Sequence, residues 1–98
     1  MIYEVLKSTG LPCAYSHFKT AQKPPYIVYI GNGQDNFSAD NLFYHSINRY
    51  QVEYYYKKKD ERKERKIETA LTNAGYMYEK SEDVYIEDQG LFVIYYYC

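Results

Sequence analysis

The chain has 98 residues, enough for one domain with a single core and too few for two. Its net charge of −1 argues against a protein steered as a whole toward nucleic acid or an anionic membrane. Tyrosine is the unusual residue, with 15 copies beside 4 Phe and no Trp. Because tyrosine joins a packing ring to a hydroxyl that needs a partner, we expect many of these side chains to be half-exposed or at subunit contacts.

The first third of the chain predicts a short helix followed by a buried strand. Ile2, Val5 and Leu6 have helical spacing, and Gly10 is a natural stop for that helix. The run YIVYI at residues 26–30 is continuously β-branched and aromatic, which predicts a strand buried on both faces. The segment GNGQDN that follows predicts a turn, since its two glycines can adopt positive φ.

Residues 46–56 alternate in the way typical of a half-buried antiparallel strand. Ile47 lies on the polar side of the alternation, which is compatible with a bulge near Asn48. The face expected to be buried carries Tyr50, Val52, Tyr54 and Tyr56.

A long amphipathic helix is predicted to follow this strand. Asp60 is the expected N-cap and Gly75 the expected C-terminal stop. Ile67, Ala70 and Leu71 form the apolar stripe that should face the sheet. Because the first turns lack a large apolar residue, we expect them to project beyond the sheet into water or a partner.

Three further segments, YMYEK, DVYIED and LFVIYYYC, read as strands, with Gly90 separating the last two. Residues 1–98 are therefore expected to form one α+β domain. The expected sheet is antiparallel and of the meander type, with about four or more strands. The long helix packs on one face of it, and the chain begins with a short N-terminal helix.

Charge is distributed unevenly along the chain. Lys57–Lys66 holds seven basic and three acidic residues, a local +4, and the remainder carries −5. This run is either the solvated start of a helix or one side of a contact between copies, because opposite patches on separate surfaces make head-to-tail contacts that close into rings. We predict such a subunit or partner interface. It comprises Asp40, Asn41, Tyr55, Lys57, Lys58, Lys59, Arg62, Glu82, Asp83 and Glu87.

Asp40 and Asn41 leave two interpretations open. Their side chains could hold a turn by hydrogen bonds to the backbone, or the loop could contact a neighbouring subunit.

The sequence predicts no catalytic, metal or cofactor site. No secretory segment precedes Cys13 and Cys98, so free thiols in a reducing cytoplasm are expected. Cys13 and His17 could in principle form a nucleophile–base dyad, but nothing supplies a third group or an oxyanion hole. No second ligand pair completes a zinc site. We therefore expect a protein that is not an enzyme.

A second hypothesis is a small nucleic-acid-binding module or ribonuclease-like toxin that uses Lys57–Lys66. The tyrosines at 54–56 could stack on bases beside these cations, and His45 could join the site. However, the interspersed acids would repel phosphates, and the overall charge lacks the usual basic excess.

The segments TGLPCAYSHFK, PPYIVYIG, FSADNLFY, YQVEYYYKKKDERKERKIETAL, YIED and LFVIYYY together resemble a family of small phage and prophage proteins. Its members are encoded in the head–tail joining and tail-completion gene block of long-tailed phages of Gram-positive bacteria. The heavier tyrosine load and the terminal Cys98 of this chain depart from the family pattern.

The resemblance implies a non-enzymatic virion protein similar to tail terminator or head–tail joining proteins. Such proteins carry a sheet flanked by helices and assemble as rings, often hexamers. Tail-tube or connector proteins are the implied partners, beside other copies of the chain. From hydropathy and net charge we expect no membrane partner and do not favour nucleic acid, which stays the second hypothesis. The implied location is the bacterial cytoplasm during assembly and then the virion.

Overall fold

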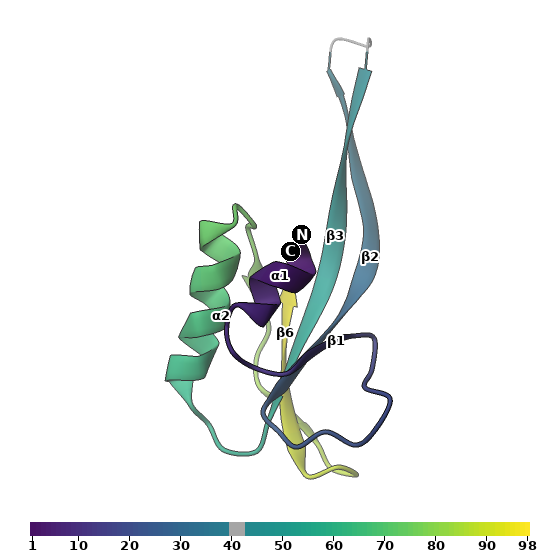
Figure 1. The fold of residues 1–98 in the computed structure, drawn as a ribbon. Helices are drawn as coiled ribbons and strands as arrows, with labels where there is room; N and C mark the ends of the chain where they lie inside the picture. The colour runs from purple at the N-terminus through teal and green to yellow at the C-terminus, as the bar shows by residue number, and fades with distance from the viewer. Residues whose placement is uncertain (40–42) are drawn as a thin grey trace.

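In the part of the chain that the structure describes, two helices cover one face of a six-stranded mixed sheet (Figure 1). This computed structural model describes the backbone of residues 1–39 and 43–98 and the side chains of residues 1–33 and 48–98. The predicted α+β class and the short N-terminal helix are confirmed. The elements in chain order are α1 (Ile2–Lys7), β1 (Cys13–Tyr15), β2 (Tyr26–Ala39), β3 (Phe43–Tyr56), α2 (Glu61–Asn73), β4 (Glu79–Lys80), β5 (Val84–Ile86) and β6 (Leu91–Tyr97).

The strands are ordered β1-β2-β3-β6-β4, and β5 also pairs with β6. All described pairs are antiparallel except β1 with β2, which are parallel with Cys13 opposite Ile27. The prediction of a purely antiparallel sheet was therefore wrong. The physical reason is the segment 16–25, which returns the chain to the start of β1 before β2 begins, as a parallel pair requires.

The core lies between the helices and the inner face of the sheet. The predicted alternation in β3 is confirmed, because Val52, Tyr54 and Tyr56 are buried on this face. Its partner β6 contributes the residues directly opposite, with Ile94 facing Tyr54 and Tyr96 facing Val52. The helices and β2 complete the cluster with Ile2, Leu6, Ile27, Ile67 and Leu71.

Both predicted ends of α2 are confirmed. The Asp60 side chain accepts a hydrogen bond of 3.0 Å from the backbone N–H of Arg62, so it caps the first turn. Gly75 follows the last turn with φ of 88°, a conformation that glycine adopts without strain. Between these signals the helix spans 13 residues, close to the average length, so the prediction of a long helix was wrong.

The segment GNGQDN does not form the predicted turn. Gly31 pairs with Tyr50 and Gln34 pairs with Asn48, so two residues of β2 lie opposite one residue of β3. This is a β-bulge, and Gly33 occupies it with φ of 80°. The position of Ile47 in the sequence pattern was compatible with a bulge near Asn48. A bulge is present there, and its extra residue lies on β2. The strand continues through this segment because the bulge accommodates the positive φ of Gly33.

Beyond the bulge, β2 and β3 continue as a two-stranded ribbon that projects from the domain (Figure 1). We call residues 34–39 and 43–47 of this ribbon the arm. β1 pairs with β2 only at residues 27–29 and β6 pairs with β3 only at residues 51–56, so the described backbone of the arm pairs only within itself. The molecule accordingly measures 50 Å in its longest dimension and about 25 Å in the others. Asp40 and Asn41, predicted at an interface, lie outside the described residues.

The last predicted strands form one interrupted edge of the sheet. β4 and β5 both pair with β6, and Ser81 lies between them. Its N–H donates to the Tyr95 carbonyl at 2.8 Å, and its Oγ accepts from the Tyr95 N–H at 2.8 Å. A side-chain oxygen therefore takes the place of a backbone carbonyl where the edge strand is broken.

Candidate functional site

A chain of ion pairs joins the start of α2 to the edge of the sheet. The Lys59 ammonium lies 2.9 Å from Asp83 Oδ2 and 2.7 Å from Glu64 Oε2. The Lys80 ammonium lies 2.9 Å from Glu64 Oε1 and 2.8 Å from Glu68 Oε2. Glu64 is the central member, with only 2% of its surface exposed. We call these five residues the ion-pair chain.

The ion-pair chain corrects two predictions. Lys59 and Asp83 were expected to face other copies, but they contact each other within one subunit. The first turns of α2 were expected to project beyond the sheet, but Glu64 buries this part of the helix against it. The cause is the loop after β3, which places Lys59 between Glu64 and Asp83. Part of the positive patch is therefore neutralised within one subunit, by the pairing of Lys59 with Glu64 and Asp83.

The pKa directions follow from these contacts. Burial lowers the pKa of Lys59, but hydrogen bonds to Glu64 and Asp83 outweigh it and raise that pKa overall. Burial raises the pKa of Asp83, but hydrogen bonds from Tyr56 and Lys59 outweigh it and lower that pKa overall. Both groups are therefore held in their charged forms.

Two tyrosine hydroxyls end the ion-pair chain, and a third lies near it without a partner. The Tyr56 hydroxyl donates to Asp83, and the Tyr96 hydroxyl donates to Glu68 at 2.7 Å. Within the described residues the buried hydroxyl of Tyr54 has no hydrogen-bond partner. Burial raises the pKa of Tyr54 to about 12, with Glu64 adding to the effect.

We expect Tyr54→Phe and Tyr96→Phe to have opposite effects on stability. Each change removes one oxygen from a fully buried ring, so each variant is the control for the other. Tyr54→Phe removes an unpaired buried hydroxyl and should leave the free energy of unfolding unchanged or raise it by up to about 1 kcal/mol. Tyr96→Phe removes a hydrogen bond to a carboxylate and should lower it by about 1.5 kcal/mol. Urea unfolding measures both, and equal losses in the two variants would contradict the assignment.

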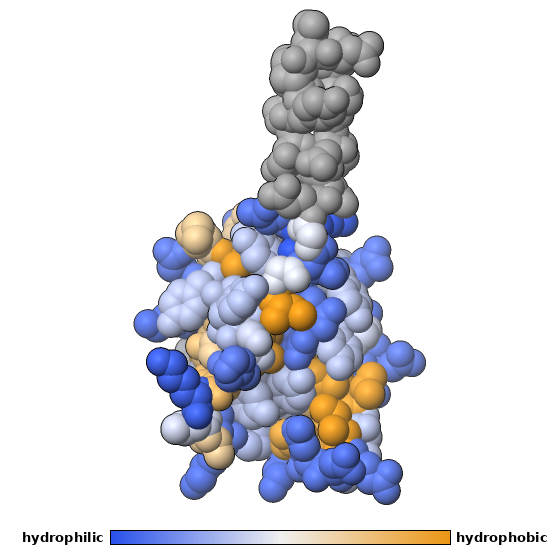
Figure 2. Space-filling model, turned by 90° about the vertical axis from the view of Figure 1, so that its right-hand side faces the viewer, coloured by the Kyte–Doolittle hydropathy of each residue, from blue (hydrophilic) through white to orange (hydrophobic). Residues whose placement is uncertain are grey.

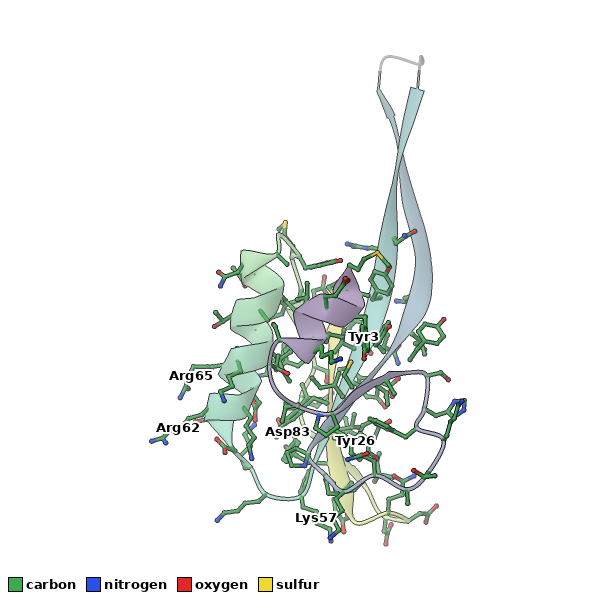
Figure 3. All side chains as sticks on the ribbon, in the orientation of Figure 1. Tyr3, Tyr26, Lys57, Arg62, Arg65 and Asp83 are labelled. Atoms are coloured by element: carbon green, nitrogen blue, oxygen red, sulfur yellow. The ribbon has the colours of Figure 1, made fainter. Side chains whose placement is uncertain are left out.

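The other predicted interface residues with described side chains lie at three places. Lys57 and Lys58 are exposed in the loop before α2, and Figure 3 shows Lys57 at the end of the molecule away from the arm. Glu82 is exposed just before β5, and Glu87 is exposed in the turn after it. Arg62 is exposed on the first turn of α2.

Tyr55, also predicted at an interface, lies on the sheet face opposite the helices. Its ring stacks on Tyr26 with centroids 5.1 Å apart. Its hydroxyl donates to Glu53 Oε1 at 2.7 Å, while Gln51 Nε2 donates to Glu53 Oε2 at 2.8 Å. Figure 2, which views the side away from α2, shows small separate hydrophobic patches on a largely hydrophilic surface. On this face the Glu53 carboxylate therefore has partners within the chain for both of its oxygens.

A groove between α1 and α2 gathers three cations of the Lys57–Lys66 run, of which only Arg62 was named individually as an interface residue. Arg62, Arg65 and Lys66 line it from α2, and Ser8 and Thr9 line it from the end of α1. Its volume is about 610 Å³. We call it the cationic groove. The helical spacing i, i+3, i+4 of its three cations could have identified it, because these positions lie on the face opposite Ile67 and Leu71.

The candidate thiol dyad lacks an activated nucleophile. Burial raises the pKa of Cys13 to about 11, which disfavours its thiolate. His17 Nδ1 lies 3.2 Å from Ser16 Oγ on the exposed surface. Cys13 and Cys98 are free thiols, as predicted. No group of three or more His, Cys, Asp or Glu among the described residues is arranged to hold a metal ion. His45, named for the nucleic-acid hypothesis, lies outside the described side chains.

Comparisons of the chain with protein-family models, curated proteins and solved structures gave no significant match. Among the described helices, none is both long and apolar enough to cross a membrane.

Proposed function

We propose that this is a non-enzymatic structural protein of a phage or prophage, acting in head–tail joining or tail completion by assembling into a ring. The arm is the observation that carries the proposal. The sequence resemblance supplies the phage context, with tail-tube or connector proteins as further partners. The place of action is then the bacterial cytoplasm during assembly and the virion afterwards.

The arm supports the proposal of assembly because its described backbone pairs with no third strand of its own chain. A two-stranded ribbon is at best marginally stable alone in water and needs further strands or a packed face. The described backbone of the arm has neither a third strand nor a pairing partner outside itself. In sequence, the segment 34–47 also includes Phe37, Leu42, Phe43 and Tyr44, and aromatic residues are enriched at protein interfaces. We infer that a second subunit or a connector protein supplies that surface.

The tyrosine content supports the same proposal. Tyrosine is enriched where protein surfaces meet, because its ring packs while its hydroxyl tolerates water. Tyr3, Tyr15, Tyr85 and Tyr97 are exposed on the domain body. They provide contact area without forming one large hydrophobic patch.

Deleting the arm should abolish assembly and leave the domain folded. Joining Gly33 directly to Asn48 removes residues 34–47 and leaves a short loop between the paired Gly31 and Tyr50, of a length common in hairpins. Light scattering across a concentration series, with and without a phage tail-tube or connector protein, measures assembly. We expect complexes from the intact chain and a loss of at least about tenfold in association from the deletion.

Circular dichroism and thermal unfolding are the controls, because no described core residue lies in the deleted segment. A deletion variant that assembles as well as the intact chain would contradict the role of the arm. An intact chain that stays monomeric throughout and binds neither partner would contradict the proposed function.

A further inference from the structure

The cationic groove holds three like charges without an opposite charge. Arg62, Arg65 and Lys66 are exposed, and no ion pair involves their side chains in the described part of the chain. Figure 3 shows Arg62 and Arg65 extending outward from α2, away from the sheet. Like charges three and four residues apart on a helix repel each other by a few tenths of a kcal/mol. An anionic partner would remove this repulsion.

The two hydroxyls on the α1 side of the groove are not free donors for a small anion. The Thr9 hydroxyl donates to the Leu6 carbonyl at 2.6 Å, and the Ser8 hydroxyl donates to the Val5 carbonyl at 2.6 Å. These donors are therefore engaged within α1. What remains is a surface groove with exposed cationic side chains and the polar Thr69 and Asn73 along the α2 wall, which suits a protruding acidic loop.

The turn between β5 and β6 is such a loop. Glu87 and Asp88 are exposed at its tip and form no ion pair in the described part of the chain. A backbone hydrogen bond closes the base of the turn, since the Gly90 N–H donates to the Ile86 carbonyl at 2.9 Å. Gly90 has φ of 64°, which closes the turn. Two carboxylates are thus held on a defined protrusion.

We propose that the cationic groove receives the β5–β6 turn of a second copy of this chain. The groove offers three cations and the turn offers two anions, so their charges are complementary. The groove lies between the helices, and the turn lies at the end of the sheet opposite the arm (Figure 1). Two different surfaces then meet in a head-to-tail contact, which closes into a ring when the rotation permits. This inference rests on the proposed function and deepens it by naming one interface.

Two variants test the pairing by exchanging charges. The groove variant carries Arg62→Glu and Arg65→Glu, and the turn variant carries Glu87→Arg and Asp88→Arg. Each alone places like charges across the contact, so we expect association at least about tenfold weaker than that of the intact chain. In an equimolar mixture, every contact again joins opposite charges when the two variants alternate. Mass photometry should therefore show assembly restored in the mixture, and restoration also demonstrates that both variants are folded.

Lys19→Glu with Lys23→Glu is the matched control, because both lysines are exposed between β1 and β2 and the pair makes the same change in net charge outside the groove. We expect this control to assemble like the intact chain. A mixture that fails to assemble, or a control that loses as much association as the groove variant, would overturn the inference. Binding of an RNA or DNA oligonucleotide at ~50 mM salt that the groove variant abolishes would also overturn it, since the groove would then serve nucleic acid.

The outcomes separate this inference from the proposed function. If both variants assemble like the intact chain while the arm deletion does not, the groove contact is wrong and ring assembly through the arm stands. If the intact chain neither self-associates nor binds a tail-tube or connector protein, the proposed function fails and this contact fails with it.

Discussion

Raising the pH above about 10 is expected to unfold this protein, with tyrosine ionisation as the main driving force. Eight described tyrosines have raised pKa values, and burial is the largest cause for each. They are Tyr26, Tyr29, Tyr54, Tyr55, Tyr56, Tyr76, Tyr95 and Tyr96. An unfolded tyrosine ionises near pH 10, so above that pH the unfolded chain releases protons that the folded chain retains. Stability that is fully present below pH 10 is therefore lost as the pH rises.

The magnitude can be stated for Tyr54, which is fully buried. Its pKa rises from 10.0 to about 12, which corresponds to roughly 3 kcal/mol of stability lost once the pH exceeds 12. The raised pKa of Lys59 acts in the same direction, because its ion pairs also weaken as the pH rises. The other tyrosines with raised pKa values act in the same direction, against a total stability of about 5–15 kcal/mol for an ordinary domain.

Tyrosinate absorbance and far-ultraviolet circular dichroism, followed together against pH, check this prediction. The eight tyrosines with raised pKa values should ionise together in a steep step that coincides with unfolding. Ionisation of all 15 tyrosines in one smooth step with the dichroism unchanged would show that burial does not control them.

Glu64→Gln is expected to be strongly destabilising. Glutamine keeps the shape of the side chain but removes the anion that Lys59 and Lys80 share within 3 Å. Removing one partner of a buried ion pair costs about 3–5 kcal/mol. Since both lysines are partly exposed, solvent screens part of this effect, and we expect a loss of about 2 kcal/mol. For a domain of this size, the melting temperature should fall by about 10 °C.

Glu61→Gln is the control for this change. Glu61 lies on the same first turn of α2 and undergoes the same loss of charge, but it is exposed. It should lose only the few tenths of a kcal/mol by which an acid near a helix N-terminus stabilises the helix. Thermal unfolding of both variants near pH 7 makes the comparison. Equal melting temperatures would mean that the ion-pair chain contributes nothing to stability.

The parts of the fold that were predicted correctly depend on local signals. Asp60 and Gly75 delimit α2 through their own backbone and side-chain preferences, and the alternation at Val52 and Tyr54 marks the buried face of β3. By contrast, GNGQDN is compatible with a turn or with a bulge, and the strand opposite decides between them. The parallel direction of β1 likewise depends on where segment 16–25 leads the chain, which no local pattern encodes.

The candidate site shows the same division. The net positive charge of Lys57–Lys66 can be counted from the sequence. The sequence does not tell which of these side chains form ion pairs. Lys59 is paired because residues far along the sequence, at the sheet edge, lie beside it after folding. Arg65 forms no ion pair within the described residues and extends outward from α2 (Figure 3). Separating satisfied from available cations therefore required the tertiary structure.

The serine that interrupts the β4–β5 edge has a consequence for unwanted polymerisation. An unbroken sheet border is a template on which another molecule can lay a strand and begin an amyloid-like fibre. Here β4 and β5 have only two and three residues. Between them, the Ser81 hydroxyl oxygen accepts the hydrogen bond from the Tyr95 N–H that a backbone carbonyl would otherwise accept. The opposite border, β1, is equally brief at three residues. The short edge strands thus protect the body of the domain against strand pairing with other molecules. If strands of two molecules do pair, we expect them to pair through the arm.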